Sequence, residues 1–251
     1  MRDFEDSTLW RISAFERIRA ETGGSGFMRL EGRPTLLPTT LQADLERLDE
    51  QDASDDVLEV VAACIRHREP ALLCMQHEQL VWPVTLFPAE GLYHSPRDMS
   101  QASRDGMAGL KVITTEPPGV RPPGHWMYER IGSADQYHPL VPWLWAVSLH
   151  GPRKTLLTEI GGTAAYRALS RSTEGRPVIT GVLGSALERL HRESVSYRDI
   201  ARWPGMNPER AARLLNALYL SAGLMVTRAN AAAKSERSLM GGLFNLGKPK
   251  R

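Results

Sequence analysis

The chain has 251 residues, of which 42% are hydrophobic and 24% are charged, and it carries a net charge of +2. These values are typical of a folded protein with one or two domains and unlike those of a disordered chain. No apolar run reaches the roughly 18 residues that a membrane-spanning helix needs, and the acidic N-terminus lacks the hydrophobic region of a signal peptide. The two cysteines do not make a disulfide framework. We therefore expect a protein of the reducing cytoplasm without membrane insertion, and the abundance of Arg, Ala, Leu and Gly suggests a bacterial source.

The net charge conceals an asymmetry between the two ends of the chain. Residues 176–251 contain thirteen Arg or Lys and five Asp or Glu, which gives +8, so residues 1–175 carry −6. A basic C-terminal part joined to an acidic N-terminal part fits nucleic acid at one end and another partner at the other. Five of those basic residues belong to the tail after Asn230, however, and the helical part before the tail carries only +4.

Apolar periodicity and turn residues divide residues 1–172 into short helices and strands. Helices are predicted over 7–20, over 41–68 with a break near Ala53-Ser54, after Pro88, over 139–150 and over 152–160, and strands over 27–30, 71–75, 80–87 and 110–115. Pro83 makes the strand over 80–87 an edge or bulged strand. The four prolines in 116–124 (EPPGVRPPG) favour a stiff, extended connection. We predict an α+β domain with a small mixed sheet.

One set of cysteines and histidines has the composition of a zinc site. Cys64 and His67 are followed by Cys74 and His77, and two cysteines with two histidines can bind zinc tetrahedrally. Residues 74 and 77 lie on a predicted strand, however, where side chains an odd number of positions apart point to opposite faces. We therefore interpret both cysteines as core residues and expect neither a metal nor a cofactor.

The segment from His125 to His138 holds the densest set of acid–base groups. General acid–base catalysis needs two such groups beside one substrate atom, which proximity along the chain does not establish. The sequence contains no nucleophile elbow, Walker motif, dinucleotide fingerprint or HExxH. We expect a protein without enzymatic activity and without catalytic residues, with an enzyme centred on this loop as an alternative.

The most complete pattern runs from Ser196 to Arg228 (SYRDIARWPGMNPERAARLLNALYLSAGLMVTR). Ser196, with an acid three residues later, is typical of a capped helix start. The Trp-Pro-Gly sequence at 203–205 ends that short helix, and Asn207 followed by proline starts a longer one. Its apolar face consists of Ala211, Leu214, Leu215, Leu218 and Ala222. Residues 224–227 have strand character.

Upstream of this stretch, another helical face consists of Val182, Leu183, Ala186, Leu187 and Leu190. Three helices and a strand in this order resemble the winged helix-turn-helix family over residues 177–230. One departure is that the family usually has two wing strands, whereas Ala-Asn-Ala-Ala-Ala-Lys after Arg228 is a poor second strand. The wing is therefore expected to be short, absent or replaced.

The resemblance implies that the second helix of the motif enters the major groove of double-stranded DNA. In this sequence, Asn207, Arg210, Arg213 and Asn216 would then meet base edges. Arg198, Arg202 and Arg228 would contact phosphates. Members of the family also serve as protein-docking or dimerisation modules, and the apolar Tyr219 and Leu220 suit that role equally.

The remaining stretch, residues 231–251, is predicted to be a flexible basic tail, with an apolar cluster that suits a docking peptide or a weak membrane-surface contact. Taken together, the sequence predicts a DNA-binding bacterial regulator of transcription, acting as a homodimer, whose acidic domain over 1–172 senses or binds a protein partner. The alternative is a signalling or assembly adaptor whose C-terminal module and tail bind protein only.

Overall fold

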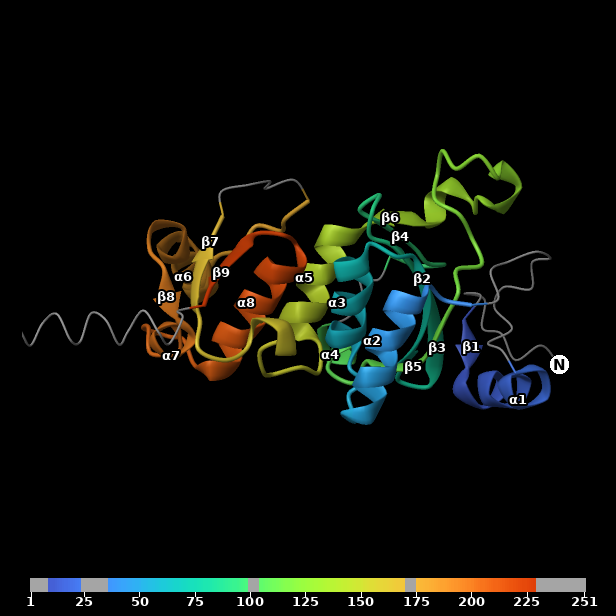
Figure 1. Ribbon diagram of the computed structural model, residues 1–251, viewed down its shortest axis with the longest axis horizontal. Coiled ribbons are helices and arrows are strands. Elements are labelled where there is room, and N and C mark those ends of the chain that lie inside the picture. The colour runs from blue at the N-terminus through green and yellow to red at the C-terminus, as the bar shows by residue number, and fades with distance from the viewer. Residues whose placement is uncertain (1–8, 24–35, 99–103, 170–174, 229–251) are drawn as a thin grey trace, which may run out of the picture.

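The computed structural model describes residues 9–23, 36–98, 104–169 and 175–228. The protein is α+β, as the sequence predicts, and elongated, with the sheet-containing part at one end of its long axis and the C-terminal helices at the other (Figure 1). The predicted strand over 27–30 and the tail over 231–251 lie outside the described residues. Within the described ranges, none of the helices combines the length and the hydropathy that crossing a lipid bilayer requires.

An antiparallel sheet, and not the predicted mixed one, forms the middle of the N-terminal part. Its strands lie in the order β5-β2-β3-β4-β6, and β1 pairs with the first residues of β3. They are β1 (Trp10–Arg11), β2 (Ala71–His77), β3 (Leu80–Phe87), β4 (Leu92–His94), β5 (Lys111–Glu116) and β6 (Tyr137–Pro139). β2 and β3 form the predicted hairpin. Pro83 lies between the residues of β3 that pair with β1 and those that pair with β4, so at that point β3 has a neighbour on one side only and tolerates a proline.

Helices cover both faces of this sheet. The first face is covered by α2 (Thr39–Glu50), α3 (Val57–His67) and α5 (Leu140–His150), and its hydrophobic cluster includes Leu73 and Trp82. On the other face α1 (Ile12–Thr22) packs Phe15 against Leu72 and Val81. The strand residues alternate between the two clusters because a strand has a period of two. The short helix α4 (Arg104–Met107) lies between β4 and β5 in the chain.

Two expectations about helix starts were wrong. The helix predicted over 41–68 is divided as expected. Serine is a common cap, so the sequence favours Ser54 as the cap of its second half, but Asp56 caps α3 instead, and its Oδ1 accepts a hydrogen bond from the Leu58 amide at 2.9 Å. An ionised carboxylate is the stronger cap because it also interacts favourably with the helix dipole. The short helix predicted after Pro88 is a turn that leads into β4.

The helix predicted over 152–160 is also absent. Residues 151–160, here called the strap, are irregular and end in the 3-10 turn η4 (Thr158–Ile160). The guanidinium of Arg153 binds the carbonyl oxygens of Thr155 and Leu156, which gives these groups a partner other than a helical amide. Two further 3-10 turns, η2 (Tyr128–Arg130) and η3 (Ala134–Gln136), precede β6.

The C-terminal part contains the helices and the strand that the helix-turn-helix pattern predicts. They are α6 (Gly181–Arg192), α7 (Tyr197–Ile200), α8 (Pro208–Leu220) and β9 (Leu224–Thr227). An antiparallel sheet in the order β8-β7-β9 joins them, with β7 (Ala165–Ala168) ahead of α6 and β8 (Val195–Ser196) between α6 and α7. The place beside β9, where a second wing strand would pair, is thus filled by a strand from upstream of the module. The winged helix-turn-helix assignment itself stays an interpretation.

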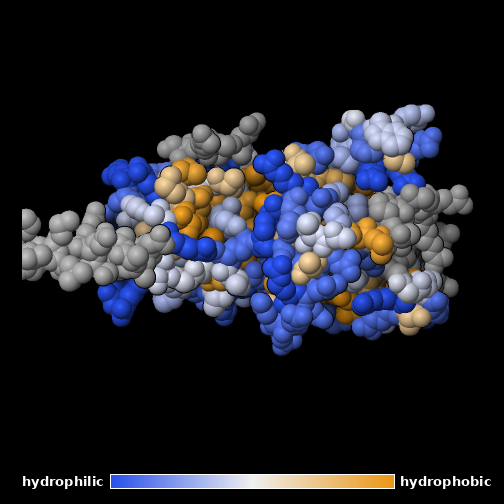
Figure 2. Space-filling view, in the orientation of Figure 1, coloured by the Kyte–Doolittle hydropathy of each residue, from blue (hydrophilic) through white to orange (hydrophobic). Residues whose placement is uncertain are grey.

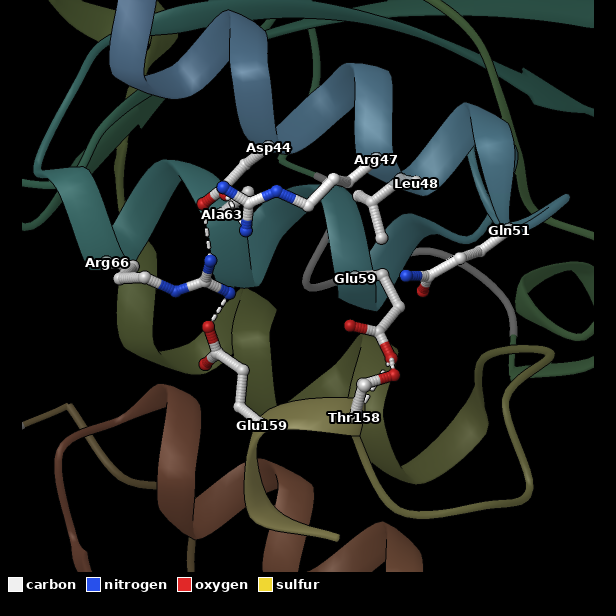
Figure 3. A pocket seen from close by; sticks show the side chains of 9 residues that line it. All are labelled: Asp44, Arg47, Leu48, Gln51, Glu59, Ala63, Arg66, Thr158 and Glu159. Atoms are coloured by element: carbon white, nitrogen blue, oxygen red, sulfur yellow. Dashed lines mark hydrogen bonds and ion pairs between the residues drawn. The ribbon is translucent and has the colours of Figure 1, made fainter.

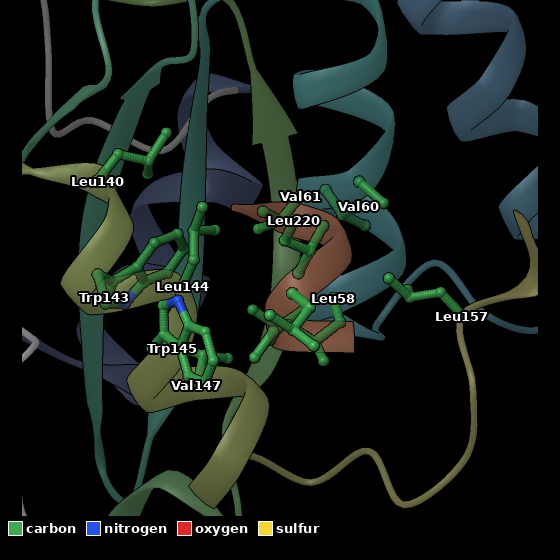
Figure 4. Close-up of a cluster of buried hydrophobic side chains, with 14 of the residues drawn as sticks. Leu58, Val60, Val61, Leu140, Trp143, Leu144, Trp145, Val147, Leu157 and Leu220 are labelled. Atoms are coloured by element: carbon green, nitrogen blue, oxygen red, sulfur yellow. The ribbon is translucent and has the colours of Figure 1, made fainter. Parts of the chain in front are cut away.

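The two parts share one hydrophobic core. Trp143 and Trp145 of α5 are fully buried, and the same cluster includes Leu58 of α3 and Leu220 of α8 (Figure 4). α5 is apolar over most of its sequence, which is typical of a helix buried on all sides. It packs against α8. The predicted boundary between residues 1–172 and 177–230 therefore marks a change of architecture within a continuous core.

Candidate functional site

The helix starts of the predicted helix-turn-helix have the capping contacts that their sequences imply. Ser196 Oγ accepts a hydrogen bond from the Asp199 amide at 3.2 Å, at the start of α7. Asn207 Oδ1 accepts one from the Arg210 amide at 2.8 Å, with proline at the first position of α8. These caps satisfy amides that a first helical turn leaves free. The local sequence therefore sets a short helix, a tight turn and a second helix.

α8 is enclosed by the rest of the protein. Eight of its thirteen residues are buried, because α5 packs along it and α6, α7 and β9 also contact it. Its exposed residues, Pro208 and Arg210, lie in the first turn. A helix that enters the major groove contacts base edges with its N-terminal residues while the groove surrounds its outer face. On α8 only one turn of such a face is available.

Two of the residues predicted to contact bases are used inside the protein. Asn216 is fully buried, where its Nδ2 donates to the Thr155 carbonyl at 2.9 Å and its Oδ1 accepts from the Leu157 amide at 3.0 Å. The Nη1 of Arg213 donates to the Leu149 carbonyl at 2.8 Å, at the C-terminal end of α5. Both side chains satisfy backbone groups of α5 or the strap. These contacts within the protein oppose a role for Arg213 and Asn216 in contacting DNA.

The other predicted DNA contacts lie at the surface. The exposed ones around the turn between α7 and α8 are Arg198, Arg202, Asn207 and Arg210. Arg210 donates to the carbonyl of Gly205 in that turn. Arg228, beyond β9, is exposed and donates to the carbonyl of Glu159. For these five residues, contact with DNA stays a prediction.

An apolar groove lies between α6 and the turn that joins α7 to α8, and it is called the α6 groove below. It has a volume of about 350 Å³ and is lined by Val182, Ser185, Ala186, Arg189, Trp203, Pro204 and Met206. Trp, Met and Arg are enriched in protein–protein interfaces. Figure 2 shows hydrophobic side chains gathering at this end of the molecule, over β7 and β9, and the exposed apolar residues of this part include Val178 and Met225. The α6 groove has the character of a docking site for an apolar group.

The walls of the α6 groove are fixed by contacts between α6 and the turn. The guanidinium of Arg189 lies over the Trp203 ring, 4.5 Å from its centroid, and also pairs with Glu193. Gly205, at φ 76°, brings the turn so close to α6 that a Cβ atom there would lie 2.7 Å from Cγ2 of Val182. The indole wall and the turn are thus held in place before any partner binds.

A second cavity, of about 230 Å³, lies where α2 and α3 meet the strap (Figure 3). Its charged side chains are paired with one another. Arg66 bridges Asp44 and Glu159, and Glu59 accepts hydrogen bonds from the Thr158 amide at 2.9 Å and hydroxyl at 2.7 Å. Tyr219 of α8 donates to Glu159 as well. We interpret this cavity as a structural junction between the two parts of the protein.

Asp44 is the carboxylate with the most ionic partners in this junction, since Arg47, Arg66 and His67 all contact it. Burial by itself raises the pKa of its carboxyl, but the hydrogen bond with His67 at 2.6 Å and the charges of Arg66 and Arg47 outweigh burial and leave the pKa below its ordinary value. Asp44 is therefore ionised at neutral pH, where it links α2 to the end of α3.

The four residues of the possible zinc site do not meet. Cys64 belongs to the larger hydrophobic cluster, and Cys74 to the smaller one on the opposite face of the sheet. His77 stacks on a tryptophan ring. Within the part of the chain that the structure describes, no three His, Cys, Asp or Glu side chains are grouped so that they could hold a metal ion. Burial raises the pKa of Cys64 to about 12, so this thiol is unreactive at neutral pH.

The histidines of the alternative catalytic loop also face different neighbours. His125 stacks on Trp126 with the ring centroids 5.6 Å apart, whereas the His138 ring contacts Tyr93 at 5.1 Å. An acid–base pair at one substrate atom needs both groups within hydrogen-bond reach of it. These contacts give the enzyme hypothesis no support.

Sequence reasoning missed the α6 groove. Val182 and Ala186 lie on the helical face that the apolar spacing assigned to the core, and one turn further on Leu190 is indeed fully buried. Val182 is 39% exposed because the turn after Trp203 covers only part of that face. A tryptophan, a proline and a glycine in succession were interpreted only as a helix stop.

No protein-family model, curated protein or solved structure matches the chain.

Proposed function

We propose that this protein is a non-enzymatic adaptor that binds a protein partner through the α6 groove of its C-terminal module. The observation that carries this proposal is the enclosure of α8. The helix that would enter DNA packs on α5, whereas the groove beside it is open and lined mainly by apolar side chains. Binding sites are concave and mostly apolar, with a few polar groups that fix orientation.

The chemistry of the α6 groove favours a protein over a nucleic acid. A duplex presents phosphates and polar base edges, and most of its hydrogen bonds with proteins go to phosphate and sugar. Neither group fills a cavity walled by Val182, Trp203 and Met206. A large apolar side chain of a partner does, and burying one contributes about 1.5–3 kcal/mol. Helix-in-groove and anchor-in-pocket contacts are recurring forms of such recognition.

Nucleic-acid binding is the second candidate function, and one observation favours it. Arg198, Arg202 and Arg210 are exposed in the segment from α7 to the first turn of α8, and so is Asn207. Such a group of arginines can bind phosphates without a base-contacting helix. Binding of this kind would be weak, insensitive to sequence and steeply dependent on salt.

Fluorescence anisotropy with a labelled duplex separates the two candidates. For an adaptor we expect no saturable binding even at about 50 mM salt. Saturable binding at that salt, which weakens steeply towards about 200 mM and which Arg202→Ala with Arg210→Ala abolishes, would replace the adaptor proposal by the nucleic-acid one.

Partner capture with a groove variant tests the adaptor function directly. Ser185 is exposed and lines the α6 groove, so Ser185→Trp fills the groove without changing the core. Glu188→Trp is the matched control, because Glu188 is exposed on the same helix but does not line the groove. Proteins cross-linked to the wild type and to Glu188→Trp, but not to Ser185→Trp, are then purified and tested for direct binding. Capture that is equal for all three chains would refute the proposal.

A further inference from the structure

A loop at the opposite end of the molecule presents two aromatic side chains to solvent. Trp126 is 79% exposed and Tyr128 is 74% exposed. Exposed aromatic groups of this size are costly in a monomer, and tryptophan and tyrosine dominate the binding energy of protein interfaces. The loop over residues 117–136, yellow-green in Figure 1, projects from the end that carries the large sheet, whereas α6 and α7 lie at the other end of the long axis.

This loop is held in one shape by hydrogen bonds at its base. The Arg121 amide donates to the Arg130 carbonyl at 2.9 Å. The Tyr137 hydroxyl donates to the Arg121 carbonyl at 2.5 Å and accepts from the Gly132 amide at 2.8 Å. The stiffness of its prolines adds to these contacts. An aromatic group on a preorganised loop loses little conformational entropy when a partner binds it.

The loop and the α6 groove complement each other. The groove, of about 350 Å³, is near the lower end of the range of ligand pockets, roughly 300–1,000 Å³, and so suits one indole-sized group. Trp203 lines the groove but is only 9% exposed and has Arg189 over its ring, so a second aromatic ring would meet only the small part of the indole that faces the groove. Among the residues that the structure describes, none fills the groove and none covers the Trp126 side chain, which is 79% exposed.

We propose that Trp126 of one molecule inserts into the α6 groove of a second molecule, so that copies of the chain associate head to tail. This inference deepens the proposed adaptor function and rests on it, because it names the occupant of the same groove. Charge favours this arrangement over a symmetric pair of groove ends, since residues 176–228 carry eight Arg and four Asp or Glu, which gives +4, whereas the loop over 117–136 carries two Arg and two acids, which gives zero. Two groove ends brought together would repel each other.

Head-to-tail contacts of this kind leave a free groove and a free loop at the two ends of every assembly. Because the two surfaces lie at opposite ends of an elongated molecule, the contact is heterologous and does not close on itself as a two-fold dimer does. The expected products are chains of increasing length as concentration rises. The homodimer predicted from the sequence would instead end at two copies.

Sedimentation velocity on three chains tests the proposal. The wild type should form a series of oligomers at high micromolar concentration, and Trp126→Ala should weaken association by about 30-fold or more, the loss typical of an interface hot spot. Ser185→Trp, which fills the groove, should also be monomeric. Leu36→Ala is the matched control, because Leu36 is 74% exposed elsewhere on the surface, and it should associate like the wild type.

Mixing the two monomeric variants gives the decisive measurement. Trp126→Ala keeps an intact groove and Ser185→Trp keeps an intact loop, so an equimolar mixture should form a heterodimer and nothing larger. No complex in the mixture, or oligomers beyond the heterodimer, would overturn the proposal. Association by Trp126→Ala that vanishes only when residues 229–251 are removed would overturn it too, because the tail would then be the occupant.

The same chains separate this inference from the proposed function. A wild type that stays monomeric at every concentration, while Ser185→Trp still abolishes partner capture, refutes self-association and leaves the adaptor function in place. If Ser185→Trp changes neither association nor capture, both proposals fail.

Discussion

Asn216 joins α8 to the strap through the Leu157 amide and the Thr155 carbonyl, and Arg153 also donates to that carbonyl. Replacing Asn216 with alanine leaves the Leu157 amide unpaired, which costs about 1–3 kcal/mol, and removes one of the two hydrogen bonds of the Thr155 carbonyl, which costs about 0.5–1.5 kcal/mol. We expect Asn216→Ala to lower the free energy of unfolding by about 2–4 kcal/mol in urea denaturation. Asn207→Ala, which removes an exposed helix cap, is the control and should cost about 1 kcal/mol. Equal losses would contradict the structural role assigned to Asn216.

His94 should make stability depend on pH. Its side chain is buried, and within the described part of the chain its Nε2 has no hydrogen-bond partner. Burial lowers its pKa below the ordinary value of 6.5, and the hydrogen bond with Gln136, which raises the pKa, offsets this only in part. The folded protein therefore binds this proton less readily than the unfolded chain does. The contribution of His94 to stability is complete above the unfolded pKa and is lost as pH falls below about 6.5.

Unfolding free energies measured in urea between about pH 7.5 and pH 5.5 check this sign. We expect the wild type to lose stability over that interval and His94→Asn, which has no ionisable group at this position, to lose less. The difference between the two slopes isolates His94 from the other histidines. A wild-type slope that is equal to, or shallower than, that of the variant would contradict the prediction.

At the scale of elements, the turn between α7 and α8 depends on Gly205. Its φ of 76° costs a residue with a Cβ about 1–2 kcal/mol, and the new Cβ atom would also lie 2.7 Å from Val182. We expect Gly205→Ala to lower the free energy of unfolding by about 2 kcal/mol or more. In the double variant Gly205→Ala with Val182→Ala, the contact is relieved and the backbone strain remains, so part of the loss should return. If the double variant instead loses as much unfolding free energy as the two single variants together, the Cβ atom at position 205 does not clash with Val182.

The helices and strands that could be predicted are those whose start, end or turn depends on residues within the element itself. α7 and α8 begin at Ser196 and Asn207, whose side chains cap them, and the hairpin of β2 and β3 has apolar strands with a tight turn. β4, β6 and β7 escaped prediction because each has only three or four residues, and β6 and β7 are in addition defined by partners far away in the sequence. The strap escaped because the ion pairs of Arg153 with Asp56 and Glu59, far away in the sequence, replace the helix that Pro152 suggested.

The candidate site was predictable only in part, for a related reason. The apolar spacing of α8 describes one face, and the polar Arg213 and Asn216 on the other sides were natural candidates for solvent or DNA. Arg213 and Asn216 are enclosed because α5 packs against α8. The sequence of α5, LVPWLWAVSLH, is almost entirely apolar and so predicts that another helix covers it, but it does not identify that helix as α8.

At the scale of the whole molecule, the continuity of the core decides how the protein unfolds. Trp143 and Leu58 belong to the same cluster as Leu220, and Arg213 binds carbonyls at the end of α5. Neither part can therefore lose its structure without exposing apolar surface of the other. We expect one cooperative transition in which far-ultraviolet dichroism and tryptophan fluorescence coincide, with equal calorimetric and van't Hoff enthalpies.

The same continuity predicts that residues 1–172 do not fold on their own, although the sequence suggests a domain of that extent. Without α8 this fragment leaves one side of α5 uncovered, and the strap loses its hydrogen bonds with Asn216 and Tyr219. It should bind a hydrophobic dye, lack a cooperative transition and aggregate on concentration. A chain that ends after Arg228 retains every described contact and is the control, so it should unfold like the full chain. A fragment that melts cooperatively, or a full chain with two separate transitions, would show instead that α5 and α8 meet across an interface between independent domains.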